Sequence, residues 1–221
     1  MARHNNIFAL EILLIDDFSM SRSQMLKLLA DAMLVPEERR SAFLGRFQHL
    51  QRLSLISGIN PGRGRAARYD PLQIMVVAIA FQMLQLGLSP ERTVQAISQN
   101  KERLYYAISL STGPSGEEVG NSIIWFDPAN ITATLDGDDF ADVTFHYGGY
   151  ATGRDAFANF FLEGWVARMA FVNIGGTIWH MIAAMQGGDH YDTKPVIGDE
   201  ARRFLSGLRS CIESADPSEP F

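Results

Sequence analysis

The sequence predicts an α+β protein whose N-terminal half is helical and whose C-terminal half mixes strands and helices. Up to about residue 110, apolar residues recur at helical spacing, and Pro and Ser mark the helix starts. After that point, short runs rich in strand formers appear at residues 122–126, 131–135 and 143–147, separated by Asp, Gly and Pro turns. The two halves also carry opposite charge, which suggests different roles.

The length of 221 residues allows two small domains or one large one. A composition of 47% hydrophobic and 20% charged residues is ordinary for an ordered globular chain. We place a boundary at residues 112–120, where a Gly- and Ser-containing loop precedes the first strand. The expected organisation is an N-terminal arm (1–17), a helical domain (18–110) and an α+β domain (111–221).

The formal net charge of −6 is unevenly distributed along the chain. Residues 18–103 carry a net charge of +6, whereas residues 104–221 carry −10. This asymmetry indicates a module that faces a polyanion, carried by an acidic body that discourages indiscriminate binding.

Two helices are expected before residue 58. The first covers residues 22–33, with Ser19 or Ser21 as its N-cap, and the second covers residues 37–57, with Pro36 in its first turn. The second helix turns an apolar stripe inward, made of Phe43, Leu44, Phe47, Leu50 and Leu53 or Leu55. Its basic side chains lie mainly away from that stripe. An ordinary helix face exposed to solvent can have the same pattern.

A basic stretch then leads into a long apolar helix. Arg63, Arg65 and Arg68 stand among small residues and end at Tyr69, which suits a cationic hairpin tip. Asp70-Pro71 is a helix start, and residues 72–86 are apolar enough to be buried on most sides but too few to span a bilayer. Gly87 ends this helix, and Ser89-Pro90 begins the next.

This order of segments, GRGRAARY followed by the apolar helix and then LGLSPERTVQAIS, resembles the wing and following helices of MerR-like winged helix-turn-helix regulators. The resemblance covers about a third of the chain. It implies a winged helix-turn-helix N-terminal half that binds double-stranded DNA as a homodimer, with the wing on phosphates and the upstream helix in the major groove. The DNA-binding residues expected on this basis are Arg39, Arg40, Arg46, Gln48, His49, Arg52, Arg63, Arg65, Arg68 and Tyr69.

One departure from the family pattern affects these assignments. The family has a short recognition helix that ends in an Arg and aromatic pair before a tight turn, whereas FLGRFQHLQRLSLISGINPG is longer and more apolar. The alternative interpretation of the stretch is a basic surface loop beside a core helix.

The C-terminal half is expected to support dimerisation or to bind an effector, either a small molecule or a protein. Its helices are predicted at residues 156–165, 173–185 and 199–212, with a strand at 168–172. Aromatic and histidine side chains there form either an effector pocket or the domain core: His146, Tyr147, Tyr150, Phe157, Trp165 and Trp179.

No catalytic or cofactor signature is present in the sequence. It has no phosphate-binding glycine loop, nucleophile elbow or metalloprotease motif, so we predict a non-enzyme without a cofactor. His180, His190 and Asp192 lack the spacing of a metal site. Cys211 is the only cysteine and no secretory signal is present, so we expect a cytoplasmic protein, nucleoid-associated when bound to DNA, with no membrane contact.

Two other functions remain open from the sequence. ILLIDDFSMSRSQMLKLL resembles the opening of a response-regulator receiver domain, in which Asp16 and Asp17 would bind magnesium, although the later strands of that pattern are missing. A ligand-sensing protein whose basic half binds RNA or a protein, and not duplex DNA, is the other alternative.

Overall fold

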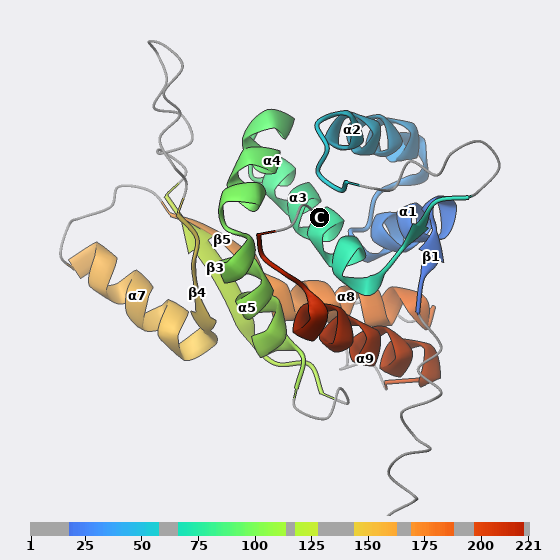
Figure 1. The fold of residues 1–221 in the computed structure, drawn as a ribbon. Helices are drawn as coiled ribbons and strands as arrows, with labels where there is room; N and C mark the ends of the chain where they lie inside the picture. The colour runs from blue at the N-terminus through green and yellow to red at the C-terminus, as the bar shows by residue number, and fades with distance from the viewer. Residues whose placement is uncertain are drawn as a thin grey trace, which may run out of the picture.

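The computed structural model describes residues 18–57, 66–113, 118–127, 144–162, 169–187 and 197–218. Helices surround one central helix, α3, and a small antiparallel sheet with its own outer helix lies at one side of the molecule (Figure 1). The mixed α+β class predicted from the sequence is confirmed.

The described chain before α3 contains two helices and two short strands that pair with each other. Ser21 caps α1 through a reciprocal capping box with Gln24, and Met20 and Ser21 of β1 lie antiparallel to the strand that precedes α3. The elements are β1 (Met20–Ser21), α1 (Arg22–Ala32), the 3-10 turn η2 (Glu37–Arg39), α2 (Arg40–Arg52) and β2 (Arg68–Tyr69).

Helix α2 is shorter than the predicted helix over residues 37–57. It ends at Arg52, because Ser54 adopts a left-handed conformation with φ 61° and the Leu55 N–H donates back to the Leu50 carbonyl at 3.1 Å. Leu55 is nevertheless buried, as the apolar pattern predicted. Leu44, which was expected to face inward, is 37% exposed.

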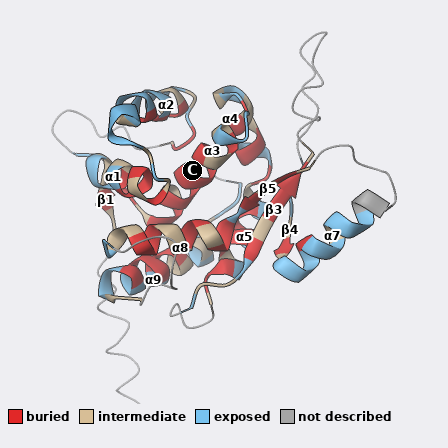
Figure 2. Cartoon of the chain, turned by 180° about the vertical axis from the view of Figure 1, so that it is seen from behind, coloured by how far each residue is buried: buried red, intermediate tan, exposed pale blue. Residues whose placement is uncertain are grey.

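Helix α3 (Pro71–Gln85) forms the centre of the core. Asp70 caps it in a capping box with Gln73, and Pro71 occupies the first turn, as predicted. Its residues from Leu72 to Met83 are buried apart from Gln73 and Gln82, and the helix is coloured almost entirely as buried in Figure 2. Gly87, with φ 95°, ends the segment and leads to α4 (Pro90–Gln99) and α5 (Lys101–Ser111).

The larger sheet has the order β4-β3-β5, and all its pairings are antiparallel. Strand β4 starts three residues later than the predicted run at 143–147, and α7 begins six residues before the predicted start at 156, because the chain turns directly from strand into helix at Tyr150. The elements are β3 (Ser122–Phe126), β4 (His146–Gly149), α7 (Tyr150–Leu162), β5 (Ala170–Asn173), α8 (Ile174–Met185) and α9 (Asp199–Ser214). The predicted strand over 131–135 lies outside the described residues.

The helices of the C-terminal half pack against those of the N-terminal half. Helix α8 lies against α1 and α3, and α9 lies against α3. The buried side chains of both halves form one continuous hydrophobic core, in which Met25 and Ile79 lie with Met181 and Phe204. The predicted boundary at residues 112–120 therefore separates segments that share a core.

The sheets bear on the receiver alternative. A receiver domain requires a parallel sheet, whereas both sheets within the described residues are antiparallel. Asp16 and Asp17 lie outside the described residues. Among the described helices, none combines the length and the apolar character needed to cross a bilayer.

Candidate nucleic-acid interface

Helix α2 lies on the outside of the molecule, attached to the core by an aromatic stripe. The ring of Phe43 stacks on that of Phe81 in α3, with centroids 4.0 Å apart, and Phe47 meets Tyr69 edge to face at 6.1 Å. Phe43, Phe47 and Leu50 are buried, as predicted. This stripe fixes which side of the helix faces solvent.

The solvent-facing side of α2 is centred on Gly45. Gly45 is two positions from both Phe43 and Phe47, and each position turns an α-helix by about 100°, so it lies nearly opposite the buried stripe. Gln48 and Arg52, three and seven residues further on, share its side, and Arg46 flanks it. All four residues are exposed, and we call this surface the α2 face.

The guanidinium groups of the α2 face keep their positive charge available. Arg46 and Arg52, together with the exposed Arg39 just before the helix, form no ion pair with any described carboxylate. Gly45 adds no side chain between them, and a Cβ at that position would meet nothing within 4 Å. A polyanion can therefore approach the helix backbone closely at this point.

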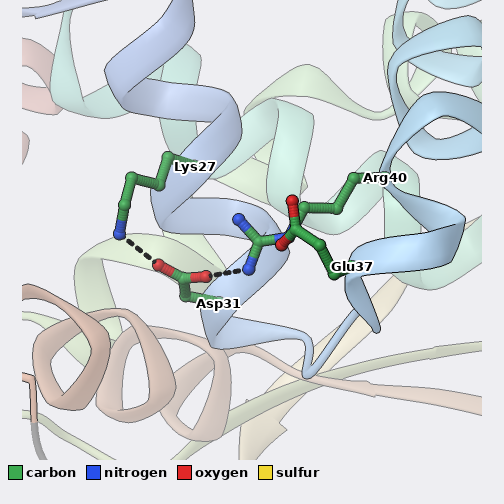
Figure 3. Close-up of polar contacts among 4 residues, drawn as sticks. All are labelled: Lys27, Asp31, Glu37 and Arg40. Atoms are coloured by element: carbon green, nitrogen blue, oxygen red, sulfur yellow. Dashed lines mark hydrogen bonds and ion pairs between the residues drawn. The ribbon is translucent and has the colours of Figure 1, made fainter.

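Arg40, predicted to bind DNA, is instead held between two carboxylates. Its Nη2 donates to Asp31 Oδ1 at 2.6 Å, and its Nε lies 2.7 Å from Glu37 Oε2, while Lys27 donates to the other oxygen of Asp31 (Figure 3). Burial acts to raise the pKa of Asp31, but hydrogen bonds from Lys27 and Arg40 hold it below its ordinary value. Arg40 thus connects α2 to α1.

His49 is partly exposed to solvent and also contacts α4. Its Nε2 lies 3.2 Å from Glu91 Oε1, in a pair where both side chains are partly exposed. Such a surface pair contributes little stability, but it places an acidic group beside this predicted DNA-binding residue.

The last two residues of the predicted wing have different environments. Arg68 is exposed, and its Nη2 donates to the Ser19 carbonyl at 2.7 Å and to Ser19 Oγ, so its guanidinium is positioned without being neutralised. Tyr69 is fully buried, and its hydroxyl accepts a hydrogen bond from Gln51 Nε2 at 2.8 Å. Burial raises the pKa of Tyr69, which keeps the phenol neutral.

The Tyr69 hydrogen bond joins the end of the predicted wing to helix α2. Gln51 immediately precedes Arg52, and Tyr69 immediately follows Arg68, so this junction links the two chain segments that carry these arginines. The intervening Arg63 and Arg65 lie outside the described residues. Tyr69 anchors this junction from inside the core.

Sequence reasoning missed two features of the interface. Arg22 places its guanidinium carbon 5.5 Å from the centroid of the Phe47 ring, a cation–π contact that no sequence pattern indicated. Gly45 could have been noticed in the sequence, because glycine destabilises a helix interior and its presence there suggests a functional or packing role.

The aromatic residues predicted for an effector pocket are spread over the C-terminal half. His146 stacks on Trp125, Tyr147 lies beside Tyr106, and Phe157 lies beside Phe171. Trp165 lies outside the described residues. Within the described part of the chain, no group of three His, Cys, Asp or Glu side chains is placed to hold a metal ion.

Comparisons of the chain with protein families, with curated proteins and with solved structures found no match.

Proposed function

We propose that the protein is a DNA-binding transcriptional regulator that lays the α2 face on duplex DNA. The observation that carries this proposal is the set of exposed, unneutralised guanidinium groups around Gly45, next to the junction that holds Arg68. Arg and Gln side chains on an exposed helix make paired hydrogen bonds to guanine and adenine edges in the major groove. Arg46, Gln48 and Arg52 are the residues assigned to that contact.

In this proposal, the basic stretch over residues 62–69, which ends at Tyr69, acts as the wing. Arg68 is fixed by Ser19 at its described end, and it would contact the phosphate backbone together with Arg63 and Arg65. Arg40 and Tyr69 support the interface without touching DNA, since the first is paired with carboxylates and the second is buried.

A homodimer remains part of the proposal, but α3 is not its interface. The apolar residues of this helix are covered within one chain, so they offer no apolar surface to a second copy. The two-fold contact therefore involves other elements. A dimer would bind two half-sites separated by whole turns of DNA, roughly 34 to 36 Å each, and selection from a random duplex library should yield a near-palindromic site.

Salt-dependent binding to a labelled duplex tests the proposal directly. If Arg46 and Arg52 contact phosphates or bases, each Arg→Ala substitution should weaken binding, and loss of a phosphate contact lowers the salt slope by about 0.9. Arg202→Ala on α9 is the matched control, because it removes the same charge from an exposed position on a helix away from α2. Fluorescence anisotropy between low and moderate salt measures all three variants.

Two results would contradict the proposal. One is the absence of salt-dependent binding to any duplex by the correctly folded chain. The other is binding that Arg202→Ala weakens as much as Arg46→Ala and Arg52→Ala do. Tighter binding to single-stranded RNA than to duplex DNA would favour the alternative of an RNA-binding protein.

A further inference from the structure

Helices α5 and α9 lie side by side (Figure 1), and an open groove runs along the surface between them. It consists of two adjoining depressions of about 440 and 380 Å³, which share Ser109 and Ile212. Tyr106 and Leu110, one helical turn apart on α5, line it with exposed fractions of 53% and 42%. This surface, which we call the α5–α9 groove, therefore presents accessible apolar side chains to solvent.

The exposed Tyr106 is supported from within its own chain. Its ring lies 5.0 Å from the ring of Tyr147 on β4, measured between centroids. A tyrosine supported in this way loses little side-chain entropy when a partner covers it, and tyrosine is enriched among the residues that dominate protein interfaces. The groove therefore suits a protein partner.

Four charged residues line the groove among those that the structure describes. Glu102 and Arg103 line one depression, and Arg209 and Glu213 line the other. Each end has one charge of each sign, so the groove is neutral although the whole chain has a net charge of −6. Two copies of the chain can therefore meet here without the repulsion that acid-rich surfaces would cause.

The charges at the two ends are held differently. Arg209 Nε donates to Glu213 Oε1 at 2.8 Å, and Arg209 Nη1 donates to the Gly113 carbonyl at 3.3 Å, so this pair lies beside Gly113. At the other end, Arg103 Nη1 donates to the Phe145 carbonyl at 2.9 Å. Its guanidinium forms no ion pair with a described carboxylate, so it is a positioned cation that can accept a partner's acid.

We propose that the α5–α9 groove is the two-fold contact of a homodimer and is covered by the same groove of a second copy. The two α5 helices run antiparallel, with the symmetry axis beside Ile108. Tyr106 and Leu110 each lie two residues from Ile108, so Tyr106 of one copy packs on Leu110 of the other. The inference rests on the proposed function for the expectation of a homodimer, and it names the surface that forms it.

The same register matches the charges. Arg103 and Gly113 each lie five residues from Ile108, so Arg103 of one copy reaches Gly113 of the other. Gly113 is the position beside which Arg209 and Glu213 are paired. The Arg103 guanidinium therefore meets the Glu213 carboxylate across the interface, and two-fold symmetry forms this pair twice.

Sedimentation equilibrium of the full chain without DNA measures the contact. Wild type should change from monomer to dimer across about 1 to 100 μM. Leu110→Glu should weaken the dimer by about 100-fold, because each buried carboxylate costs about tenfold and a two-fold interface carries the substitution twice. Leu86→Glu is the matched control, since Leu86 at the end of α3 is a leucine of similar exposure, 47%, outside the groove.

A charge exchange keeps the test decisive if Leu110→Glu is poorly folded. Arg103→Glu places two carboxylates opposite each other and should weaken the dimer roughly tenfold. Adding Glu213→Arg makes the facing charges opposite again and should recover the wild-type dimer affinity. The double variant still lacks the hydrogen bond from Arg103 to the Phe145 carbonyl, so this recovery cannot come from repaired folding.

Three results would overturn the proposal. They are a wild-type chain that stays monomeric at about 100 μM, a dimer that Leu86→Glu weakens as much as Leu110→Glu does, and a failure of Glu213→Arg to rescue Arg103→Glu. Duplex affinity is measured separately. A monomeric chain that binds duplex DNA would refute the interface alone, whereas a dimer that these variants dissociate but that binds no duplex would refute the proposed function alone.

Discussion

Substitutions of Gly45 test two claims: that this position of helix α2 faces solvent, and that the α2 face contacts DNA. Gly45→Ala should stabilise the fold, because glycine in a helix interior costs about 0.8 to 1.0 kcal/mol relative to alanine. Nothing lies within 4 Å of a Cβ at this position, and Gly45 is not among the glycines with positive φ, so no steric penalty offsets the gain. The expected rise in Tm is about 2 to 4 °C for a protein of this size.

Urea denaturation of wild type and Gly45→Ala measures the stability. The midpoint should rise while the slope m stays constant, since the surface exposed on unfolding does not change. An unchanged or lower midpoint would mean that position 45 is not an open, solvent-facing helical site, and the placement of the α2 face would fail with it.

Two substitutions of opposite charge at position 45 test the DNA contact. Lys and Glu have similar helix propensities, so Gly45→Lys and Gly45→Glu should fold equally well. If the α2 face lies on DNA, the lysine should tighten binding and steepen the salt slope by about 0.9, while the glutamate weakens binding. Equal duplex affinity of the two variants would show that this side of α2 faces away from DNA.

Three other predictions concern the fold. Burial raises the pKa of Asp70 above its ordinary 3.8, so the folded state holds its proton more tightly and wild-type stability falls as pH rises through that raised pKa. Asp70→Asn keeps a capping side chain without this titration and should gain relative to wild type over that pH range in thermal melts. Asp70→Ala lacks both the titration and the cap, so it should be about 1 kcal/mol less stable than Asp70→Asn at every pH. A pH-independent difference between Asp70→Asn and wild type would contradict this. Gly175→Ala should destabilise by about 1 to 3 kcal/mol in urea titrations, because its Cβ would lie 2.2 Å from the Gly120 carbonyl oxygen, and wild-type stability would refute that close approach. A fragment ending at Leu110 should fail to unfold cooperatively, since α3 loses its cover from α8 and α9, and a sharp thermal transition for the fragment would show instead that the halves fold separately.

Local chemistry made the helix starts readable from the sequence. Asp70-Pro71 with Gln73, and Ser89-Pro90, satisfy or remove backbone N–H groups within one turn, so no distant residue is needed to define α3 and α4. The burial of α3 was equally readable, because a run of apolar residues on every side of a helix has to be covered by protein. The sequence did not indicate which helices provide that cover.

The candidate interface was readable only in part. Arg46, Gln48 and Arg52 are exposed as expected, because their spacing from Phe43 and Phe47 is a property of the helix itself. The positions of Arg40 and Tyr69 depended on partners elsewhere in the chain, a carboxylate on α1 and the amide of Gln51. The sequence around a basic or aromatic residue does not show whether such a partner lies elsewhere in the fold.

The end of α2 and the joining of the halves were likewise determined by tertiary structure. Leu55 continues the apolar spacing past Arg52, although the chain has already turned at Ser54, because a buried side chain can follow a helix end as well as continue the helix.

The change of patterning near residues 112–120 marks a change in element type. It does not mark a change of core, since an apolar helix face such as that of α8 packs wherever complementary surface is available, and here that surface belongs to α1 and α3.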